Sequence, residues 1–399
     1  MKSLLPIAGQ GVFVFEYIDK ENPTEFTIMN HSTTDGIKVS FTHDHVTVSR
    51  GNEIYEDVKN HSGLSPYTGA YYWFSLDSQN QRFFAGVGEA RIETAIYSYQ
   101  YSPKTKEEHR SIKDFLESLT TVHYSSTIYM LRIIRDPITQ IIPLIVKDID
   151  QLTMSDIASA TYMPIVNLPT ICQKLYNCIA GEKFVLDTPD FPDFTQAIEY
   201  SIRTPGMWCY QKLLDKSREF NPDKPNPIET YLRITLGQNN GESPGIPYVM
   251  EIWPIGHYSP IHSHANGNAI IRVLNGEIHV SLFPFLCAEK ESVPPFGSTV
   301  FKKGDITWIT PTLNQTHQLK NLETNTYTCI TIQCYMYNDT SNTHYDYFDY
   351  LDDNGEKQQY EPDSDMDFIE FKKKIKEEWN HYNKKKNEEK NWMLTKCFF

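Results

Sequence analysis

One short stretch decides the fold of this chain: Gly256-His257-Tyr258-Ser259-Pro260-Ile261-His262-Ser263-His264. Side chains alternate along an extended segment, so His262 and His264, one residue apart, point to the same side of a strand. A third imidazole, His317, arrives from a later segment and can complete a face of three nitrogens on one metal ion. The pattern therefore predicts a catalytic metal site with coordination positions left open for substrate and oxygen.

The histidine pair stands in a longer frame of glycines and turn residues. Eleven residues separate His264 from Gly276. The frame then continues with Gly304, Pro311, His317 and Asn321. This arrangement resembles the two sequence motifs of the cupins, whose fold is a double-stranded β-helix, or jelly-roll barrel. A lone surface His-x-His pair, the alternative, has no such frame.

An acidic ligand that many cupins place between His264 and Gly276 is missing, and Ala269 stands at its position. Three neutral imidazoles leave a ferrous ion its full charge, which suits an anionic substrate such as a thiolate. Oxygenases that use 2-oxoglutarate need His-x-Asp/Glu, and Ser263-His264 does not supply that carboxylate.

From about Tyr231 to about Asp349 the chain resembles the thiol dioxygenases, and among them cysteine dioxygenase. Trp253 lies nine residues before His262, as the tryptophan of that family does, and Ser259 fills the usual serine position. The run Thr230-Tyr231-Leu232-Arg233 is similar to the Tyr-x-Arg strand of the family. The separation of His262 from His317 and the His-x3-Asn ending agree as well.

The resemblance implies an Fe(2+) cofactor held by His262, His264 and His317, and a reaction of L-cysteine with O2 that gives cysteine sulfinate. It also implies that Arg233, with Tyr231 beside it, binds the carboxylate of the substrate. A guanidinium suits that task because its planar fork of donors matches a carboxylate and its charge is permanent. The alternative role for Arg233 is a structural ion pair. Trp253, Ser259 and Ala269 are expected around the pocket.

The strand expected at Cys329–Tyr337 departs from the family, which carries Ser-x-His-x-Tyr there. The matching positions are Thr331, Gln333 and Tyr335, so Gln333 replaces a histidine behind the active-site tyrosine. A glutamine can still hold the hydroxyl of Tyr335, but it does not titrate near neutral pH. Tyr337 points to the same side and is an alternative for that tyrosine. Ala269 also rules out the Cys-Tyr crosslink of the animal enzymes.

Two other functions stay open. One is a cupin enzyme that acts on another small thiol or on the N-terminal cysteine of a protein. The other is a non-catalytic cupin that binds a ligand or a partner. Free cysteine should be the preferred substrate if Arg233 rewards a carboxylate.

Residues 1–165 are expected to form a separate β-sandwich-like domain, because short alternating runs are separated by Asp, Asn and Gly turns. The segment from Tyr72 to Tyr99 resembles a β domain named after farnesoic acid O-methyltransferase. That name implies no methyl transfer here, because Arg91 stands where a third glycine would be needed. The expected role is to bind a protein or ligand partner. His43-Asp44-His45 is a rival metal pair without a third ligand.

The remaining boundaries follow from composition. A strand pair is expected at Tyr129–Ile134 and Gln140–Val146, and helices from Asp190 to Phe220 with a break at Pro205-Gly206. Residues 166–360 are expected to form the cysteine-dioxygenase-like cupin domain. Residues 361–399 are expected to form an amphipathic helix and tail that pack on the domain.

Charge and cysteine usage limit the partners. A net charge of −14 gives no electrostatic basis for binding nucleic acid. Seven cysteines without regular spacing favour a reducing compartment. The apolar run at the start is too short for a secretion signal, and no apolar run is long enough to span a membrane. We therefore expect a cytoplasmic enzyme.

Overall fold

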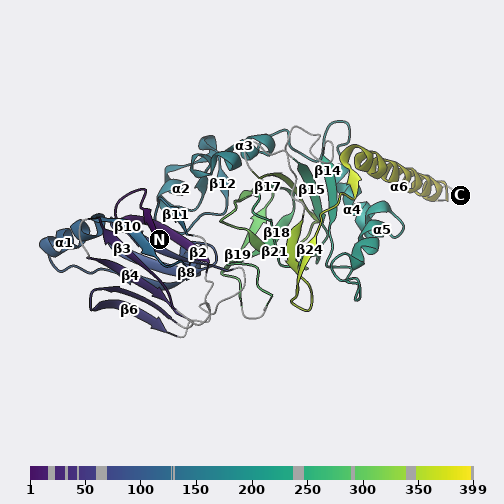
Figure 1. The fold of residues 1–399 in the computed structure, drawn as a ribbon. Coiled ribbons are helices and arrows are strands. Elements are labelled where there is room, and N and C mark those ends of the chain that lie inside the picture. Colours follow the sequence, from purple (N-terminus) through teal and green to yellow (C-terminus); the bar gives the residue numbers. More distant parts are fainter. Residues whose placement is uncertain are drawn as a thin grey trace. The chain divides into compact units, whose positions relative to one another are not determined.

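The computed structural model describes residues 1–16, 23–31, 35–42, 45–59, 70–126, 128, 131–236, 247–288, 293–337 and 347–396 (Figure 1). The chain forms two compact units. The first contains Met1–Ile142 and Phe283–Gly297, and the second contains Pro143–Leu282 and Ser298–Phe399. Among the described residues, no helix is both long and apolar enough to cross a membrane.

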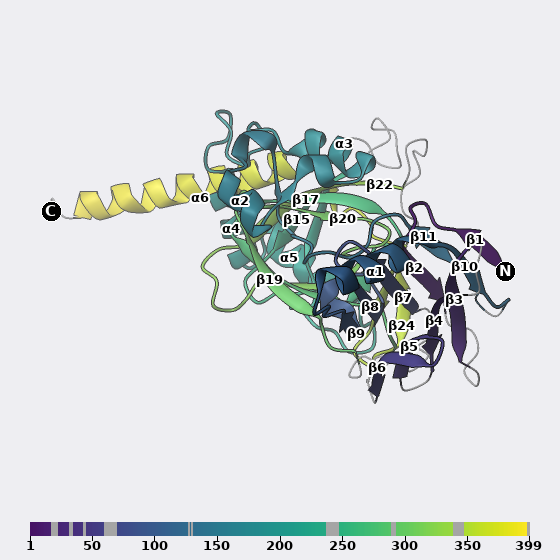
Figure 2. The ribbon, with the colours of Figure 1, turned by 90° about the vertical axis from the view of Figure 1, so that its left-hand side faces the viewer.

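The first unit is a sandwich of two antiparallel sheets (Figures 1 and 2). The larger sheet contains, in spatial order, β1 (Lys2–Leu4), β10 (Leu119–Tyr124), β3 (Thr24–Asn30), β4 (Gly36–Phe41), β5 (His45–Arg50) and β6 (Glu53–Lys59). The smaller contains β11 (Arg132–Ile134), β2 (Gln10–Glu16), β7 (Tyr71–Asp77), β8 (Arg82–Val87) and β9 (Ala95–Gln100). The unit also contains η1 (Ile92–Thr94) and α1 (Lys106–Glu117).

Aromatic side chains from both sheets form the core of this sandwich. Phe13 of β2 packs on Phe26 of β3 with ring centroids 5.6 Å apart, and Phe15 packs edge-on against Phe41 at 5.0 Å. All four are at most 1% exposed. Alternation produces this core, because every second residue of a strand faces the opposite sheet. The short alternating runs expected in this region do form strands, among them β3, β4, β5 and β7.

The expected pairing of residues 129–134 with residues 140–146 is wrong. β11 pairs with β2 in the first unit, and β12 (Val146–Lys147) pairs in parallel with β13 (Met163–Pro164) in the second. Prolines at positions 137 and 143 lack the N–H that a ladder needs, which explains why the two segments do not form a hairpin. Residues 129–130 and His43-Asp44 lie outside the described residues.

The division of the chain also differs from the expected boundary at residue 165. Residues 143–165 belong to the second unit, where the indole Nε1 of Trp308 donates to the carbonyl of Pro143 at 3.2 Å. Residues 283–297 belong to the first unit, where the N–H of Glu89 donates to the carbonyl of Pro284 at 3.0 Å. The connection between β18 (Glu277–Phe283) and β19 (Gly297–Lys302) of the second unit therefore belongs to the first unit.

Two six-stranded sheets form the second unit. One contains β20 (Ile306–Ile309), β17 (Asn268–Asn275), β22 (Cys329–Met336), β15 (Tyr248–Trp253), β14 (Leu232–Leu236) and β25 (Met366–Asp367). The other contains β19 (Gly297–Lys302), β18 (Glu277–Phe283), β21 (Thr316–Lys320), β16 (His262–Ser263), β23 (Phe348–Leu351) and β24 (Lys357–Tyr360). Neighbouring strands such as β14 and β15 run antiparallel, whereas β25 joins β14 in parallel. The predicted mainly β fold with a cupin-type jelly-roll barrel is confirmed.

Helices cover the outer face of the first of these sheets. They are α3 (Thr170–Ile179), α4 (Phe194–Arg203), α5 (Trp208–Asp215) and α6 (Phe368–Lys396). The unit also contains α2 (Met154–Ser159), η2 (Ile149–Gln151), η3 (Ile165–Asn167) and η4 (Lys216–Arg218). Residues of α4, α5 and α6 pack with Leu232, Met250 and Ile330 of three neighbouring strands. The expected helical lead-in is confirmed, and it breaks at Gly206, whose φ of +85° suits glycine.

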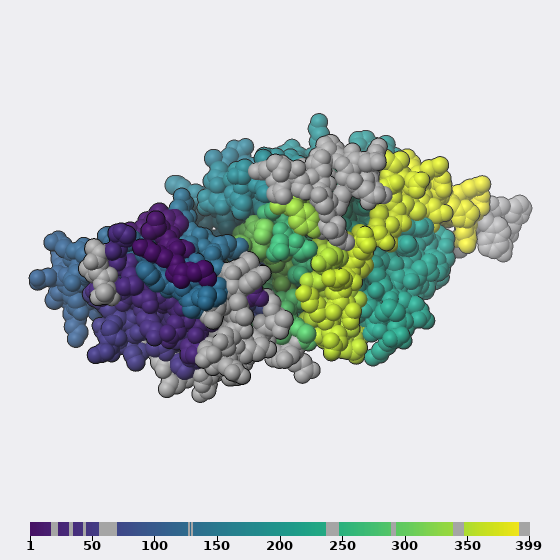
Figure 3. Space-filling view, in the orientation of Figure 1, coloured from purple at the N-terminus to yellow at the C-terminus, as the bar shows by residue number. Residues whose placement is uncertain are grey.

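The long helix α6 is anchored through its first half, as far as Tyr382, whose ring lies 4.5 Å from that of Tyr200. Phe371 and Ile375 are fully buried in the helix-covered cluster, which confirms that this segment packs on its own unit. The later turns extend beyond the barrel and its helices, as the yellow end of the chain shows in Figures 1 to 3.

Candidate metal centre

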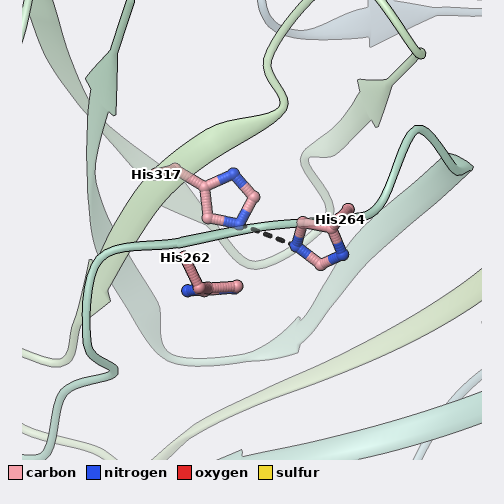
Figure 4. A group of neighbouring side chains, drawn as sticks. All are labelled: His262, His264 and His317. Carbon is pink, nitrogen blue, oxygen red and sulfur yellow. Dashed lines mark hydrogen bonds between the residues drawn. The ribbon is translucent and has the colours of Figure 1, made fainter. Parts of the chain in front are cut away.

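Three histidines lie together inside the barrel (Figure 4). His262 of β16 pairs in register with His317 of β21, and His264 follows β16 directly. One ring nitrogen from each lies within 4.8 Å of the others, and the two Nε2 atoms of His264 and His317 are 3.0 Å apart. A tight turn follows, in which Ala265 and Asn266 have positive φ and the N–H of Gly267 donates to the carbonyl of His264 at 2.8 Å.

Backbone carbonyls fix the tautomers of two of these rings. The Nδ1 of His262 donates to the carbonyl of Pro260 at 3.0 Å, and that of His317 donates to the carbonyl of Asn314 at 3.1 Å. A carbonyl only accepts, so each Nδ1 carries the hydrogen and each Nε2 keeps its lone pair. In the metal-free protein the proton between His264 and His317 therefore belongs to Nε2 of His264. A metal ion would replace that proton.

Burial keeps these imidazoles neutral. Desolvation lowers the pKa of His262 to about 4 and that of His317 to about 3, and the neighbouring His262 lowers the latter further. Desolvation also lowers the pKa of His264 well below its usual range, with the charges of His317, His262 and Arg233 acting in the same direction. The neutral form is the one that binds metals.

The three rings fit a divalent metal ion. Their nitrogens converge, and two of them are oriented by carbonyl acceptors as ligand histidines usually are. Imidazole ligands suit iron, zinc, copper and nickel alike, so the donor set defines a metal site without selecting the ion.

The cluster opens onto a small cavity within the second unit. Both sheets contribute apolar walls: Ile271, Val273, Ile278, Val280, Leu282, Phe301, Trp308, Ile309, Leu319 and Phe348, with Leu144 from the preceding segment. The polar lining residues besides the histidines are Tyr231, Glu251, Thr307, Asn314, Thr331 and Gln333. A largely apolar pocket with a few convergent polar groups is typical of a small-molecule site.

Arg233 is buried beside this cavity and contacts a carboxylate of the protein itself. Its Nη1 lies 3.4 Å from Oε1 of Glu251, which stands opposite it on the neighbouring strand β15. The two side chains are only 3% and 7% exposed. The predicted clamp for a substrate carboxylate thus already has an internal partner, and Glu251 lines the cavity.

A chain of hydrogen bonds extends from this ion pair to the predicted tyrosine. The Nε2 of Gln333 donates to Oε2 of Glu251 and to Oγ1 of Thr331, the latter at 3.3 Å. The hydroxyl of Tyr335 donates to Oε1 of Gln333. Burial raises the pKa of Tyr335 well above its usual value, so the phenol stays protonated. The Tyr335 ring stacks against His264 with centroids 5.8 Å apart.

Opposing effects set the charge of the ion pair. Burial raises the pKa of Glu251, while Arg233 and then Gln333 oppose that rise. Burial disfavours the charge on Arg233, but Glu251 and the nearby tyrosines outweigh it and its pKa is raised. The pair therefore brings one positive and one negative group together at the cavity.

The remaining predicted pocket residues occupy different environments. Tyr231 and Trp253 both line the cavity and stack on each other, with centroids 4.1 Å apart. The hydroxyl of Ser259 instead accepts from the N–H of Leu319 at 3.1 Å, which ties two barrel segments together. Ala269 pairs in register with Tyr335, and the half-buried Tyr337 packs against the same cluster.

The sequence reasoning missed Glu251. The signal was available, because an acidic residue interrupts the otherwise apolar or aromatic strand Tyr248-Val-Met-Glu251-Ile-Trp253. Glu251 lies two positions before Trp253 and therefore on the same face. A carboxylate in that position had to face the barrel interior.

Comparisons with known proteins find local likeness only. No family model matches the chain, and no curated protein does. One similar solved structure is the Cnp3 cupin domain of Schizosaccharomyces pombe, 13% identical over 26% of this chain and 63% of that one, with a TM-score of 0.20. A cupin 2 domain-containing protein of Halorhodospira halophila is 14% identical over 34% of this chain and 73% of that one, with a TM-score of 0.22. An oxalate oxidase in complex with the substrate analogue glycolate is 18% identical over 31% of this chain and 55% of that one, with a TM-score of 0.22.

Likeness at this level contributes nothing to the argument for function, which depends on the geometry of the chain itself. The resemblance of the N-terminal region to a named β domain, and its role as a binding module, stay predictions. What the topology and the site establish together is a cupin-type barrel that encloses a cluster of three histidines able to hold a metal ion.

Proposed function

We propose that the second unit is an iron-dependent thiol dioxygenase, which converts a thiol and O2 into a sulfinic acid, with both oxygen atoms transferred to sulfur. The observation that carries the proposal is a cluster of three neutral imidazoles, without a carboxylate ligand, at the end of a mostly apolar cavity. Neutral ligands leave a divalent ion its full charge, which favours direct binding of an anionic thiolate.

His262, His264 and His317 would hold the iron through their converging nitrogens. When bound, ferrous iron supplies the redox chemistry that makes dioxygen reactive toward a thiolate sulfur. The carbonyls of Pro260 and Asn314 keep two of the rings in the tautomer that presents Nε2. The buried position of the rings prevents their protonation from competing with the metal at neutral pH.

The chain contributes orientation and exclusion of water. Apolar walls from β17, β18 and β20 surround the space in front of the histidines, which favours a small substrate with an aliphatic body. Tyr335 donates its only hydroxyl hydrogen to Gln333 and is kept protonated by burial, and its ring stacks on His264. The phenol therefore supports the position of His264, and its oxygen can only accept a further hydrogen bond.

L-Cysteine is the first substrate to test, followed by other small thiols and a peptide that begins with cysteine. The protein is loaded with ferrous iron, incubated with each thiol in air, and assayed for oxygen consumption and for the sulfinate by mass spectrometry. One O2 consumed per sulfinate formed is the expected result. A protein that retains iron but oxidises none of these thiols would be a binding module instead.

A matched pair of variants tests the assignment of the ligands. His264→Ala should remove both iron and sulfinate formation. His279→Ala, which removes a half-buried histidine of β18 outside the cluster, should retain both. Sulfinate formation that survives in His264→Ala at the wild-type rate would refute the proposed centre.

A further inference from the structure

Glu251 occupies a central place in the cavity wall. It lies on β15 between Arg233 of β14 and Thr331 of β22, with which it pairs in register on either side. Its side chain is nearly buried and its carboxylate contacts Arg233 and Gln333. A carboxylate has about four lone-pair positions, so these two contacts leave capacity for a donor from the cavity.

The cavity offers no other formal charge of either sign among the described residues that line it. Its remaining polar lining comes from neutral hydroxyl, amide, imidazole and phenol groups. Arg233 itself is engaged by Glu251 at 3.4 Å. A substrate carboxylate near the guanidinium would have to share it with Glu251, and two carboxylates at one buried site repel each other strongly.

We infer that Glu251 determines the specificity of this site, and that it selects a thiol whose far end carries an ammonium group instead of a carboxylate. The inference rests on the proposed thiol chemistry. It replaces the expectation that Arg233 favours substrates with a free carboxylate. Glu251 neutralises the charge of the Arg233 guanidinium, and its carboxylate oxygens can accept a further hydrogen bond from a donor in the cavity. An aliphatic aminothiol matches both the apolar walls and this single anionic group.

Binding without turnover tests the inference directly. The full chain is loaded with ferrous iron and titrated under argon with cysteamine or with 3-mercaptopropionate, and the Kd values are measured by calorimetry. The two probes share a short aliphatic thiol and differ in the charge at the far end. Wild-type protein should bind cysteamine at least about tenfold more tightly, as expected for one charge-assisted contact.

Glu251→Gln should reverse this preference, because it retains the shape of the side chain and removes the carboxylate that would repel the carboxylate of 3-mercaptopropionate beside Arg233. Glu323→Gln is the matched control: it removes one negative charge from a side chain of the same unit that is 66% exposed. Its Kd ratio should equal that of the wild type. If Glu251→Gln does not fold, the wild-type titrations decide alone, and equal Kd values for the two probes would refute the role of Glu251.

The failures can be told apart. If 3-mercaptopropionate binds more tightly than cysteamine to the wild type, or if the ratio is unchanged in Glu251→Gln, the role of Glu251 is refuted while the thiol chemistry stands. If neither probe binds and no thiol yields a sulfinate, the proposed function is refuted and the inference with it.

Discussion

Separate replacement of Arg233 and Glu251 should destabilise the second unit far more than replacement of both together. Both side chains are almost inaccessible and their charged atoms are 3.4 Å apart. Removing one member of a buried pair typically costs about 3–5 kcal/mol, because the other charge stays buried without its counterion. Replacing both with apolar residues of similar size is often close to neutral.

The two single variants should differ. Arg233→Met leaves a glutamate that can take up a proton, because burial already raises its pKa. Glu251→Met leaves a guanidinium that cannot lose its charge. We therefore expect about 4 kcal/mol for Glu251→Met, about 2 kcal/mol for Arg233→Met near pH 6, and about 1–2 kcal/mol for the double variant.

The effect of pH on Arg233→Met follows from the sign of the shift. A carboxyl group whose pKa is higher in the folded than in the unfolded protein favours folding most below its unfolded value, near 4.5. That contribution is lost as the pH rises through the folded pKa. Because the guanidinium that opposes the shift is gone, the urea midpoint of Arg233→Met should fall more between pH 5 and 8 than the wild-type midpoint.

Urea unfolding of the metal-free proteins measures all four free energies, so that metal binding does not contribute. The expected coupling energy is about 4 kcal/mol. If the two single effects add to the double effect within about 0.5 kcal/mol, the side chains do not act as a pair. The account of the cavity charge would then be wrong.

Three further outcomes are expected. Removal of iron by a chelator should lower the Tm of the wild type but not the Tm of His317→Ala, because a metal stabilises the fold by mass action only where it binds. Equal Tm shifts in the two proteins would show that the metal binds elsewhere. Phe371→Ala should cost about 3–5 kcal/mol in urea unfolding, whereas Ile369→Ala, at a side chain 77% exposed, should cost under about 0.5 kcal/mol. Gly86→Ala should destabilise the first unit by more than about 2 kcal/mol in thermal unfolding, because its Cβ would collide with the ring of Trp73; a Tm within 1 °C of the wild type, on the order of the measurement error, contradicts this packing.

The barrel and the histidine cluster could be predicted because the relevant signal is local in the sequence. Period-two alternation fixes which side of a strand His262, His264 and Gln333 face, and the turn glycine Gly276, with φ of +68°, fixes where one strand ends. Both features follow from backbone geometry and need no knowledge of distant segments.

Pairwise charge contacts could not be predicted in the same way. Arg233 and Glu251 are eighteen residues apart, and only the register between β14 and β15 brings them opposite each other. The sequence shows a suitable arginine, but whether it meets a substrate or a neighbour depends on that register. The division of the chain was missed for a similar reason, because residues 283–297 carry no composition change that marks them as part of another unit.

That excursion of residues 283–297 means that neither unit corresponds to one continuous piece of the gene. Phe285 contributes to the apolar core of the sandwich, and Cys287 and Val293 are 7% exposed. A truncated protein that began at Pro143 would contain these side chains without the rest of the first unit. One that ended at Ile142 would lack them. The two strands on either side of this segment, β18 and β19, both supply walls of the cavity beside the three histidines. Each unit is therefore interrupted in sequence by the other, and a cut at any single point between residues 142 and 298 leaves at least one unit incomplete.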